Sequence, residues 1–309
     1  MNLRFISCLL PIFVMPAWVN AQPTVIVDFK EPFQGNTTAI TGTTVGSFNF
    51  AAYGFANNAA NFTLLTNAIM VELRKDYFGL PTTNQNPLSP IPQGMELNVN
   101  FMVGDIGTSY PFEHYFVQVG SYVSGSGAGS LGIAQIDAVR ARNGTHPGSV
   151  ANGSVVASVF TDALNGLTGL TPANALTSGN LQYSALAIDG TLAHEIGHTL
   201  SLFHVYSLNS TQPGGSPPPP GTPSLIPTPL LGTGALDLPN QDRIEEREFS
   251  LAARETANGP FVNQVGHLVS SLGLRPAPVP EPTTLTLIVT VGGVSGMLAV
   301  FRRREKRRA

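Results

Sequence analysis

Cysteine is almost absent from this chain of 309 residues. The one cysteine, Cys8, lies in the first apolar segment, so the body of the chain has no thiol. This excludes a disulfide framework, a cysteine nucleophile and a zinc site built from cysteine thiolates. A metal site in the body would therefore have to use histidine or carboxylate ligands.

Charge is scarce as well, at 11% of all residues, and positive charge is the scarcer kind between the two ends. Residues 22–280 contain nine Lys or Arg against seventeen Asp or Glu, which gives a net charge of −8. Such an acidic body does not offer the phosphate-neutralising surface that nucleic-acid binding requires. The remaining composition, 42% hydrophobic with 32 Gly and 25 Pro, is typical of a folded, loop-rich exported domain.

Residues 1–21 have the pattern of a secretory signal peptide. Arg4 precedes a mostly apolar run, and that run leads into Val-Asn-Ala, which predicts cleavage between Ala21 and Gln22. The run is short and is broken by Pro11 and Pro16, which argues against an uncleaved membrane anchor. We therefore expect the body of the protein to be exported.

The other end of the chain predicts a transmembrane helix. Residues 283–301 are uncharged and largely apolar, and their number approaches the ~20 that span a bilayer as a helix. The basic tail that follows, beginning with Arg302–Arg304, predicts that the C-terminus stays in the cytoplasm. This tail is therefore interpreted as a topology signal and not as a nucleic-acid patch.

Residues 279–309 resemble the PEP-CTERM sorting signal of Gram-negative bacteria, because Pro280–Glu281–Pro282, one apolar helix and a terminal arginine cluster follow in order. The resemblance implies recognition by an exosortase-type enzyme in the inner membrane and removal of the tail. It further implies a final location at the cell surface or in the extracellular matrix of an exopolysaccharide producer. An ordinary single-pass anchor is the alternative.

Residues 22–278 form the predicted folded domain, and their hydrophobic periodicity favours an α+β fold. The expected strands are 24–30, 95–105, 114–123, 153–164 and an edge strand at 132–136. The expected helices are 62–80, 191–200 with Asp189 as its cap, a charged helix at 242–254, and 263–274. Residues 212–229 are so rich in proline that they must form a loop.

The segment TLAHEIGHTLSLFH, residues 191–204, carries the clearest chemistry. His194 and His198 are four residues apart, so on a helix they project from one face and can bind one metal ion. Glu195 follows the first of them and can reach a water molecule on that ion. Zinc lowers the pKa of such a water to about 7, and a neighbouring carboxylate can take its proton.

His204 lies six residues beyond His198, which on an unbroken helix would turn it about 120° away from the ligand face. It becomes a third ligand if the helix ends near residue 201 and the chain turns back. Otherwise one of the downstream glutamates is the better candidate, as in thermolysin-like enzymes. Those glutamates are Glu245, Glu246 and Glu248.

The same segment resembles the metzincin metalloproteases, whose pattern is H-E-x-x-H-x-x-G-x-x-H. His194, Glu195, His198 and His204 match its four chemical positions. The resemblance implies a twisted sheet over an active-site helix, a Zn²⁺ cofactor held by the three histidines, Glu195 as general base, and a protein or peptide substrate.

The chain departs from the metzincin pattern in three places. Ser201 replaces the glycine, and a serine in the left-handed backbone conformation costs about 1 kcal/mol. Leu231, within 230–239, stands where these proteases have a methionine under the metal, and a leucine can also form that hydrophobic floor. Val205 does not match the residue that follows the third histidine in the best-known subfamilies.

Two other functions compete with a secreted endopeptidase. One is a non-catalytic surface or matrix protein with a retained metal-binding helix, and the other is a zinc hydrolase with a downstream Glu as third ligand. The remaining histidines, His114, His146 and His267, are expected to be structural or exposed. Tyr206 is expected to pack rather than to stabilise an oxyanion.

Overall fold

The computed structural model describes residues 22–30, 37–38, 42–139, 150–167, 179–205, 230–231, 243–254 and 261–278. The chain divides into one compact unit, Met1–Leu274, and a second unit from Arg275 to Ala309. The predicted signal peptide, the proline-rich loop, the sorting signal, His146 and Tyr206 all lie outside the described residues. Within the described ranges, no helix is both long enough and apolar enough to cross a membrane.

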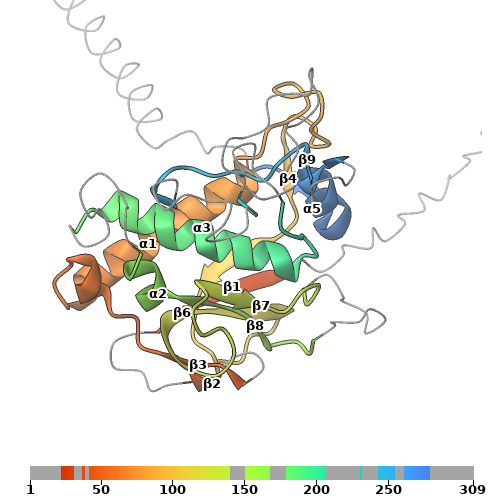
Figure 1. Ribbon diagram of the computed structural model, residues 1–309. Coiled ribbons are helices and arrows are strands. Elements are labelled where there is room, and N and C mark those ends of the chain that lie inside the picture. Colours follow the sequence, from red (N-terminus) through yellow and green to blue (C-terminus); the bar gives the residue numbers. More distant parts are fainter. Residues whose placement is uncertain are drawn as a thin grey trace, which may run out of the picture. The chain divides into compact units, whose positions relative to one another are not determined.

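The centre of the compact unit is a twisted mixed sheet of seven strands (Figure 1). Its longest strand, β6, is parallel to β1 and β8 and antiparallel to β3. Strand β5 extends the sheet in parallel beyond β1, and β7 is antiparallel to β8. The strands are β1 (Thr24–Phe29), β2 (Thr37–Thr38), β3 (Thr44–Gly46), β5 (Asn100–Val103), β6 (His114–Ser124), β7 (Gly132–Ala134) and β8 (Val155–Phe160).

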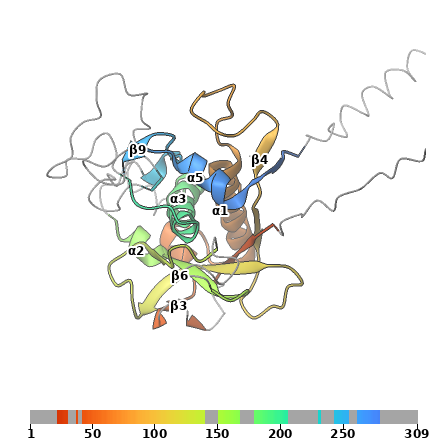
Figure 2. The same cartoon turned by 90° about the vertical axis from the view of Figure 1, so that its right-hand side faces the viewer.

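Two long helices, α1 (Ala59–Phe78) and α3 (Leu181–Thr199), lie side by side over one face of this sheet (Figures 1 and 2). Helix α1 buries the stripe that its periodicity predicts, with Leu65, Ile69 and Leu73 fully buried. Side chains of both helices and of the central strands share one hydrophobic core. This packing fixes α3, which carries the histidine segment, against the sheet.

Shorter elements complete the fold. Strands β9 and β10 form an antiparallel pair, and Asn263 caps α5 by accepting a hydrogen bond from the amide of Gly266. The elements are η2 (Phe50–Tyr53), β4 (Met95–Leu97), α2 (Thr161–Asn165), β9 (Ala253–Arg254), β10 (Phe261–Val262), α5 (Gln264–Leu272) and β11 (Leu274–Pro276).

Two predicted strands are divided in the structure. The segment 95–105 forms β4 and β5, because the backbone changes partners between them: the Asn98 amide donates to the Gly273 carbonyl, and the Asn100 amide donates to the Pro23 carbonyl. The segment 153–164 ends as a strand at Phe160 and continues as the short helix α2.

Helix α3 begins ten residues earlier than predicted. Asn180 caps it, its side chain accepting a hydrogen bond from the Tyr183 amide at 3.1 Å. Asp189 is therefore not a cap; it lies buried in the middle of the helix beside Gly190. Asp and Gly usually interrupt a helix, but here Asp189 contacts Asp76 and Gly190 contacts Arg247, and the helix continues through both residues.

The predicted charged helix at 242–254 is wrong: residues 243–254 contain no α-helix. Their backbone groups bond to distant segments, since the Glu248 carbonyl accepts from the Leu230 amide and the Ser250 carbonyl accepts from the Gln264 amide, each at 2.9 Å. Two charged residues of this segment, Arg243 and Arg247, are only 3% and 4% exposed.

Candidate metal centre

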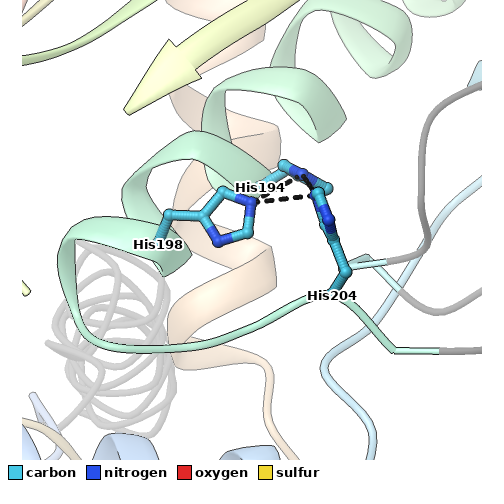
Figure 3. Close-up of side chains that lie close together, drawn as sticks. All are labelled: His194, His198 and His204. Atoms are coloured by element: carbon cyan, nitrogen blue, oxygen red, sulfur yellow. Dashed lines mark hydrogen bonds between the residues drawn. The ribbon is translucent and has the colours of Figure 1, made fainter. Parts of the chain in front are cut away.

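Three histidine rings converge at the C-terminal end of α3 (Figure 3). His194 and His198 project from one face of the helix, and His204 reaches them from the segment that follows it. The Nε2 atom of His194 lies 3.0 Å from that of His198 and 3.1 Å from that of His204, and the Nε2 atoms of His198 and His204 are 3.1 Å apart. This cluster could bind a metal ion.

Backbone carbonyls fix the orientation of two of these rings. His194 Nδ1 lies 2.8 Å from the Leu230 carbonyl oxygen, and His198 Nδ1 lies 2.7 Å from the Leu202 carbonyl oxygen. Because a carbonyl accepts, the ring proton sits on Nδ1 and the Nε2 lone pair points into the cluster. A tetrahedral zinc site with Zn–N bonds of about 2.0–2.1 Å places its nitrogens roughly 3.3 Å apart, so the three side chains fit such an ion.

Burial keeps these rings neutral, which is the form that binds metal. It lowers the pKa of His198 to about 4. Burial also lowers the pKa of His194 well below its ordinary value, and the proximity of His198 lowers it further. At neutral pH both residues are therefore ready to act as ligands.

The turn after α3 brings His204 into the cluster. Ser201 has a φ of 69°, the left-handed conformation that the glycine of the metzincin pattern would adopt. The Leu202 amide donates to the Gly197 carbonyl and the Ser201 amide to the His198 carbonyl, each at 3.0 Å. These two bonds form a Schellman motif, which ends the helix and reverses the chain without a glycine.

A second segment braces this turn. The Ser201 hydroxyl donates to Asp137 Oδ1, and the Asp137 amide donates to the His198 carbonyl at 3.1 Å. Asp137 itself has a left-handed φ of 66°, a conformation that Asp tolerates better than most residues. The sequence analysis missed Asp137, because a contact between residues 64 positions apart leaves no local pattern.

Leu230 and Leu231 lie beneath the cluster. The Leu231 side chain is fully buried, and its Cδ2 atom would lie 3.1 Å from a β-carbon placed on Gly197 of α3. The Leu231 carbonyl also accepts the Val205 amide at 2.9 Å, which ties down the chain beside His204. Leu231 thus packs against α3 and holds the chain beside His204, and Leu230 contributes the carbonyl that orients His194.

Glu195 is 7% exposed and lies against β7. A β-carbon on Gly132 would come within 2.6 Å of Glu195 Oε1, so the glycine leaves the space that the carboxylate occupies. Burial raises the pKa of Glu195 to about 8. The carboxyl group therefore sits in a poorly solvated position next to the first histidine, where a proton can be both taken and returned.

The cluster opens into a cleft of about 510 Å³. One side is formed by β7 and the loop before it, and another by α3, with Gly190, Thr191, His194, Glu195 and His198. Arg243 and Arg247 also line the cleft. Both arginines belong to the segment that was predicted as a charged helix, and their position beside the site was not predicted.

The alternative ligands do not join the cluster. Glu245, Glu246 and Glu248 are exposed, and Glu246 approaches Lys75 at 4.0 Å. Among the described residues, His194, His198 and His204 form the one group of three or more potential ligands close enough to share an ion. His114 is buried, with Nδ1 2.8 Å from the Phe112 carbonyl, which fits the structural role expected for it.

Comparison with known proteins yields distant structural likeness alone. No protein-family model matches the chain, and no curated protein matches it either. One similar solved structure is the GM1-bound form of the ECX AB5 holotoxin, with a TM-score of 0.32, 17% identity, and 81% of this chain and 80% of that chain covered. Another is mature mirolysin of Tannerella forsythia in complex with a cleaved peptide, with a TM-score of 0.29, 14% identity, and 81% and 91% covered.

Proposed function

We propose that this protein is a secreted or surface-associated zinc-dependent endopeptidase of metzincin type. The observation that carries the proposal is the convergence of three histidine Nε2 atoms within 3.0–3.1 Å of one another. A structural zinc site would be complete with ligands alone. The buried Glu195 beside His194 adds the general base that hydrolysis requires.

Each residue of the centre has a role in the proposed reaction. His194, His198 and His204 would hold Zn²⁺, which when bound would supply the Lewis acidity that lowers the pKa of a water molecule and polarises a carbonyl. Glu195 accepts the proton of that water at its carboxylate and returns it to the nitrogen of the leaving peptide. Its carboxyl group is buried beside His194 and next to the cleft, which is the position that this exchange requires.

The cleft suits an extended peptide. Strand β7 lines it through Gly132 and Ala134, and within the described part of the sheet β7 pairs with β8 alone. Its second edge can therefore accept backbone hydrogen bonds from a substrate strand. Gly132 keeps this edge close to Glu195. The signal peptide and sorting signal predicted at the two ends would deliver the enzyme to the surface of a Gram-negative cell.

The proposal is tested on the full chain purified in detergent, by zinc content and casein cleavage. Wild type should bind one zinc and cleave casein, and a chelator should abolish cleavage. Glu195→Ala should retain zinc but lose at least about a thousandfold in rate, since the general base and its proton transfers are removed. His204→Ala should lose zinc itself.

Two outcomes would refute parts of the proposal. Bound zinc with equal cleavage by wild type and Glu195→Ala would refute the proposed enzyme. Bound zinc without any cleavage would favour a non-catalytic surface protein. The three-histidine ligand set would be refuted if His204→Ala kept its zinc content while substitution of Glu245, Glu246 or Glu248 removed it.

A further inference from the structure

The cleft contains two buried arginines beside the histidine cluster. Arg243 and Arg247 are 3% and 4% exposed, yet both line the cavity into which His194 and Glu195 open. Buried arginine is normally accompanied by carboxylates or phosphates that satisfy its charge and its donors. The surroundings of these two residues therefore indicate what the cleft receives.

Helix α3 is shaped to admit Arg247. A β-carbon on Gly190 would overlap the Arg247 guanidinium, so this group lies directly over the glycine. Gly190 is four residues before His194, and these positions share the face of α3 that also carries His198. Arg247 therefore sits one helical turn from the first zinc ligand, in a space kept open by a glycine that the helix itself disfavours.

Arg247 interacts electrostatically with the buried carboxyl groups of Asp76 and Asp189. It also lines a second cavity of about 240 Å³, which is bordered by Glu72 and Asp76 of α1. Asp76 and Asp189 are hydrogen-bonded to each other, and Arg247 is the charge that opposes the burial of both. Burial raises the pKa of Asp76 to about 7 and that of Asp189 well above its usual value, so burial favours the protonated forms of both carboxyl groups.

Arg243 has no such partner among the described residues. It lines the cleft and not the second cavity, and its Nε atom is buried without a hydrogen-bond acceptor. Burial and the neighbouring Arg247 charge lower its pKa to about 10. Among the described residues, Arg247 therefore faces the Asp76 and Asp189 carboxyls, whereas no carboxylate lies close enough to Arg243 to raise its pKa again.

We propose that Arg243, supported by Arg247, is a carboxylate-binding subsite of the cleft, which selects peptides with an acidic side chain or a free C-terminal carboxylate near the cleaved bond. The selection rests on the proposed peptidase function. A carboxylate that enters the cleft would accept a hydrogen bond from Arg243 Nε and pair with the charge of its guanidinium. A lysine at the same position would be repelled, and a glutamine would gain hydrogen bonds but no charge pairing.

The test measures peptide binding without turnover. Acetylated hexa-alanine peptides carry one Glu, Gln or Lys at each position in turn, each as a free acid and as a C-terminal amide. Dissociation constants are measured calorimetrically on the zinc-loaded full chain bearing Glu195→Ala, so that no peptide is cleaved. Glu should bind roughly tenfold or more tightly than Gln at one position, as expected for a charged hydrogen bond.

Arginine variants then locate the preference. In the same background, Arg243→Gln should bring the Glu-to-Gln ratio close to one, while Arg243→Lys should keep most of it. Arg74→Gln removes the same charge from an exposed position on α1 outside the cleft and should leave the ratio unchanged. A preference that follows the free C-terminus instead of Glu identifies the chain end as the source of the carboxylate.

The outcomes separate this subsite from the peptidase itself. Equal binding of Glu and Gln peptides in both terminal forms overturns the subsite, and so does the absence of binding by every Glu peptide. The subsite is also overturned if the preference for Glu over Gln peptides remains in Arg243→Gln, even when wild type cleaves casein. Conversely, an acid preference in a chain that never cleaves casein refutes the peptidase and leaves the subsite standing.

Discussion

The two halves of α3 are built on different principles. Around His194 and His198, the chemistry follows from the spacing of neighbouring residues along one helix. Around Asp189 and Gly190, one turn earlier, the local residues would normally interrupt a helix, yet the helix continues through both. The first half is stabilised there by Asp76 and Arg247, which come from distant parts of the chain.

This difference shows which structural features a short motif can carry. The spacing of His194 and His198 is a property of the helix alone, so it survives in any sequence that remains helical there. At Asp189 and Gly190 the helix is accompanied by a hydrogen bond between Asp189 and Asp76 and by a guanidinium that fills the space above the glycine. The second half can therefore be predicted locally, and the first half cannot.

The largest effect should come from adding one methyl group to the first half of the helix, at Gly190. Gly190→Ala must displace the buried Arg247 guanidinium, which costs about 3 kcal/mol when a buried charge loses its place, against a gain of about 1 kcal/mol in helix propensity. We expect a net loss of about 2 kcal/mol in the free energy of unfolding, measured by urea titration of the full chain.

Gly197→Ala is the matched control in the other half. Its new β-carbon would meet Leu231 Cδ2 at 3.1 Å, a contact that a small side-chain shift relieves. The free energy of unfolding should stay within about 1 kcal/mol of wild type, because helix propensity offsets the crowding. If Gly190→Ala is as stable as Gly197→Ala, the two halves do not differ in the way described.

A smaller effect should follow from changing the turn at Ser201. Ser201→Ala keeps the left-handed strain but loses the hydroxyl bond to Asp137, whereas Ser201→Gly loses the same bond and also relieves the strain. We expect zinc to bind about tenfold more weakly to the alanine variant and less weakly than that to the glycine variant. Competition with a chromophoric chelator measures both dissociation constants.

Asp137→Asn is the control for the turn, since asparagine keeps a hydrogen-bond acceptor and tolerates the left-handed conformation. Its zinc affinity should remain near that of wild type. Weaker binding by Ser201→Gly than by Ser201→Ala would mean that backbone strain at residue 201 does not govern the position of His204.

The smallest effect should be a pH dependence that arises in the Asp189 half of the helix. The folded pKa of Asp76 is raised from 3.8 to about 7, so the pair favours folding below about pH 4 and loses that contribution as the pH rises through 7. Asp189→Asn removes one of the two carboxyls. Relative to wild type, this variant should gain on the order of 1 kcal/mol in free energy of unfolding between pH 5 and pH 7.

The difference between variant and wild type is the quantity to measure, with a chelator present. His194 and His198 have lowered pKa values, so they stabilise the fold as the pH rises to about 6.5, which is the opposite sign. Their contribution is common to both proteins and cancels in the difference. A flat difference curve would show that Asp76 and Asp189 do not share a proton.

Much of the scaffold was accessible from sequence because it depends on local periodicity. The stripe of α1, strands β1 and β6, the edge position of β7 and the common face of His194 and His198 all follow from side-chain spacing. The predictions for the start of α3 and for the segment 243–254 were wrong for one reason: the backbone and charged groups there are satisfied by distant residues. Arg243, Arg247 and Asp137 also depend on distant contacts. Their positions around the cleft were therefore not predicted, although the histidine cluster was.

The bond between Ser201 and Asp137 has a consequence for how relatives of this protein can be found. A search pattern written along consecutive positions demands glycine at 201 and rejects this chain. In the folded protein the turn rests on two positions 64 residues apart, which no pattern of consecutive residues can contain. A pattern that accepts serine at 201 together with Asp or Asn in the segment after β7 would describe the requirement of the turn itself.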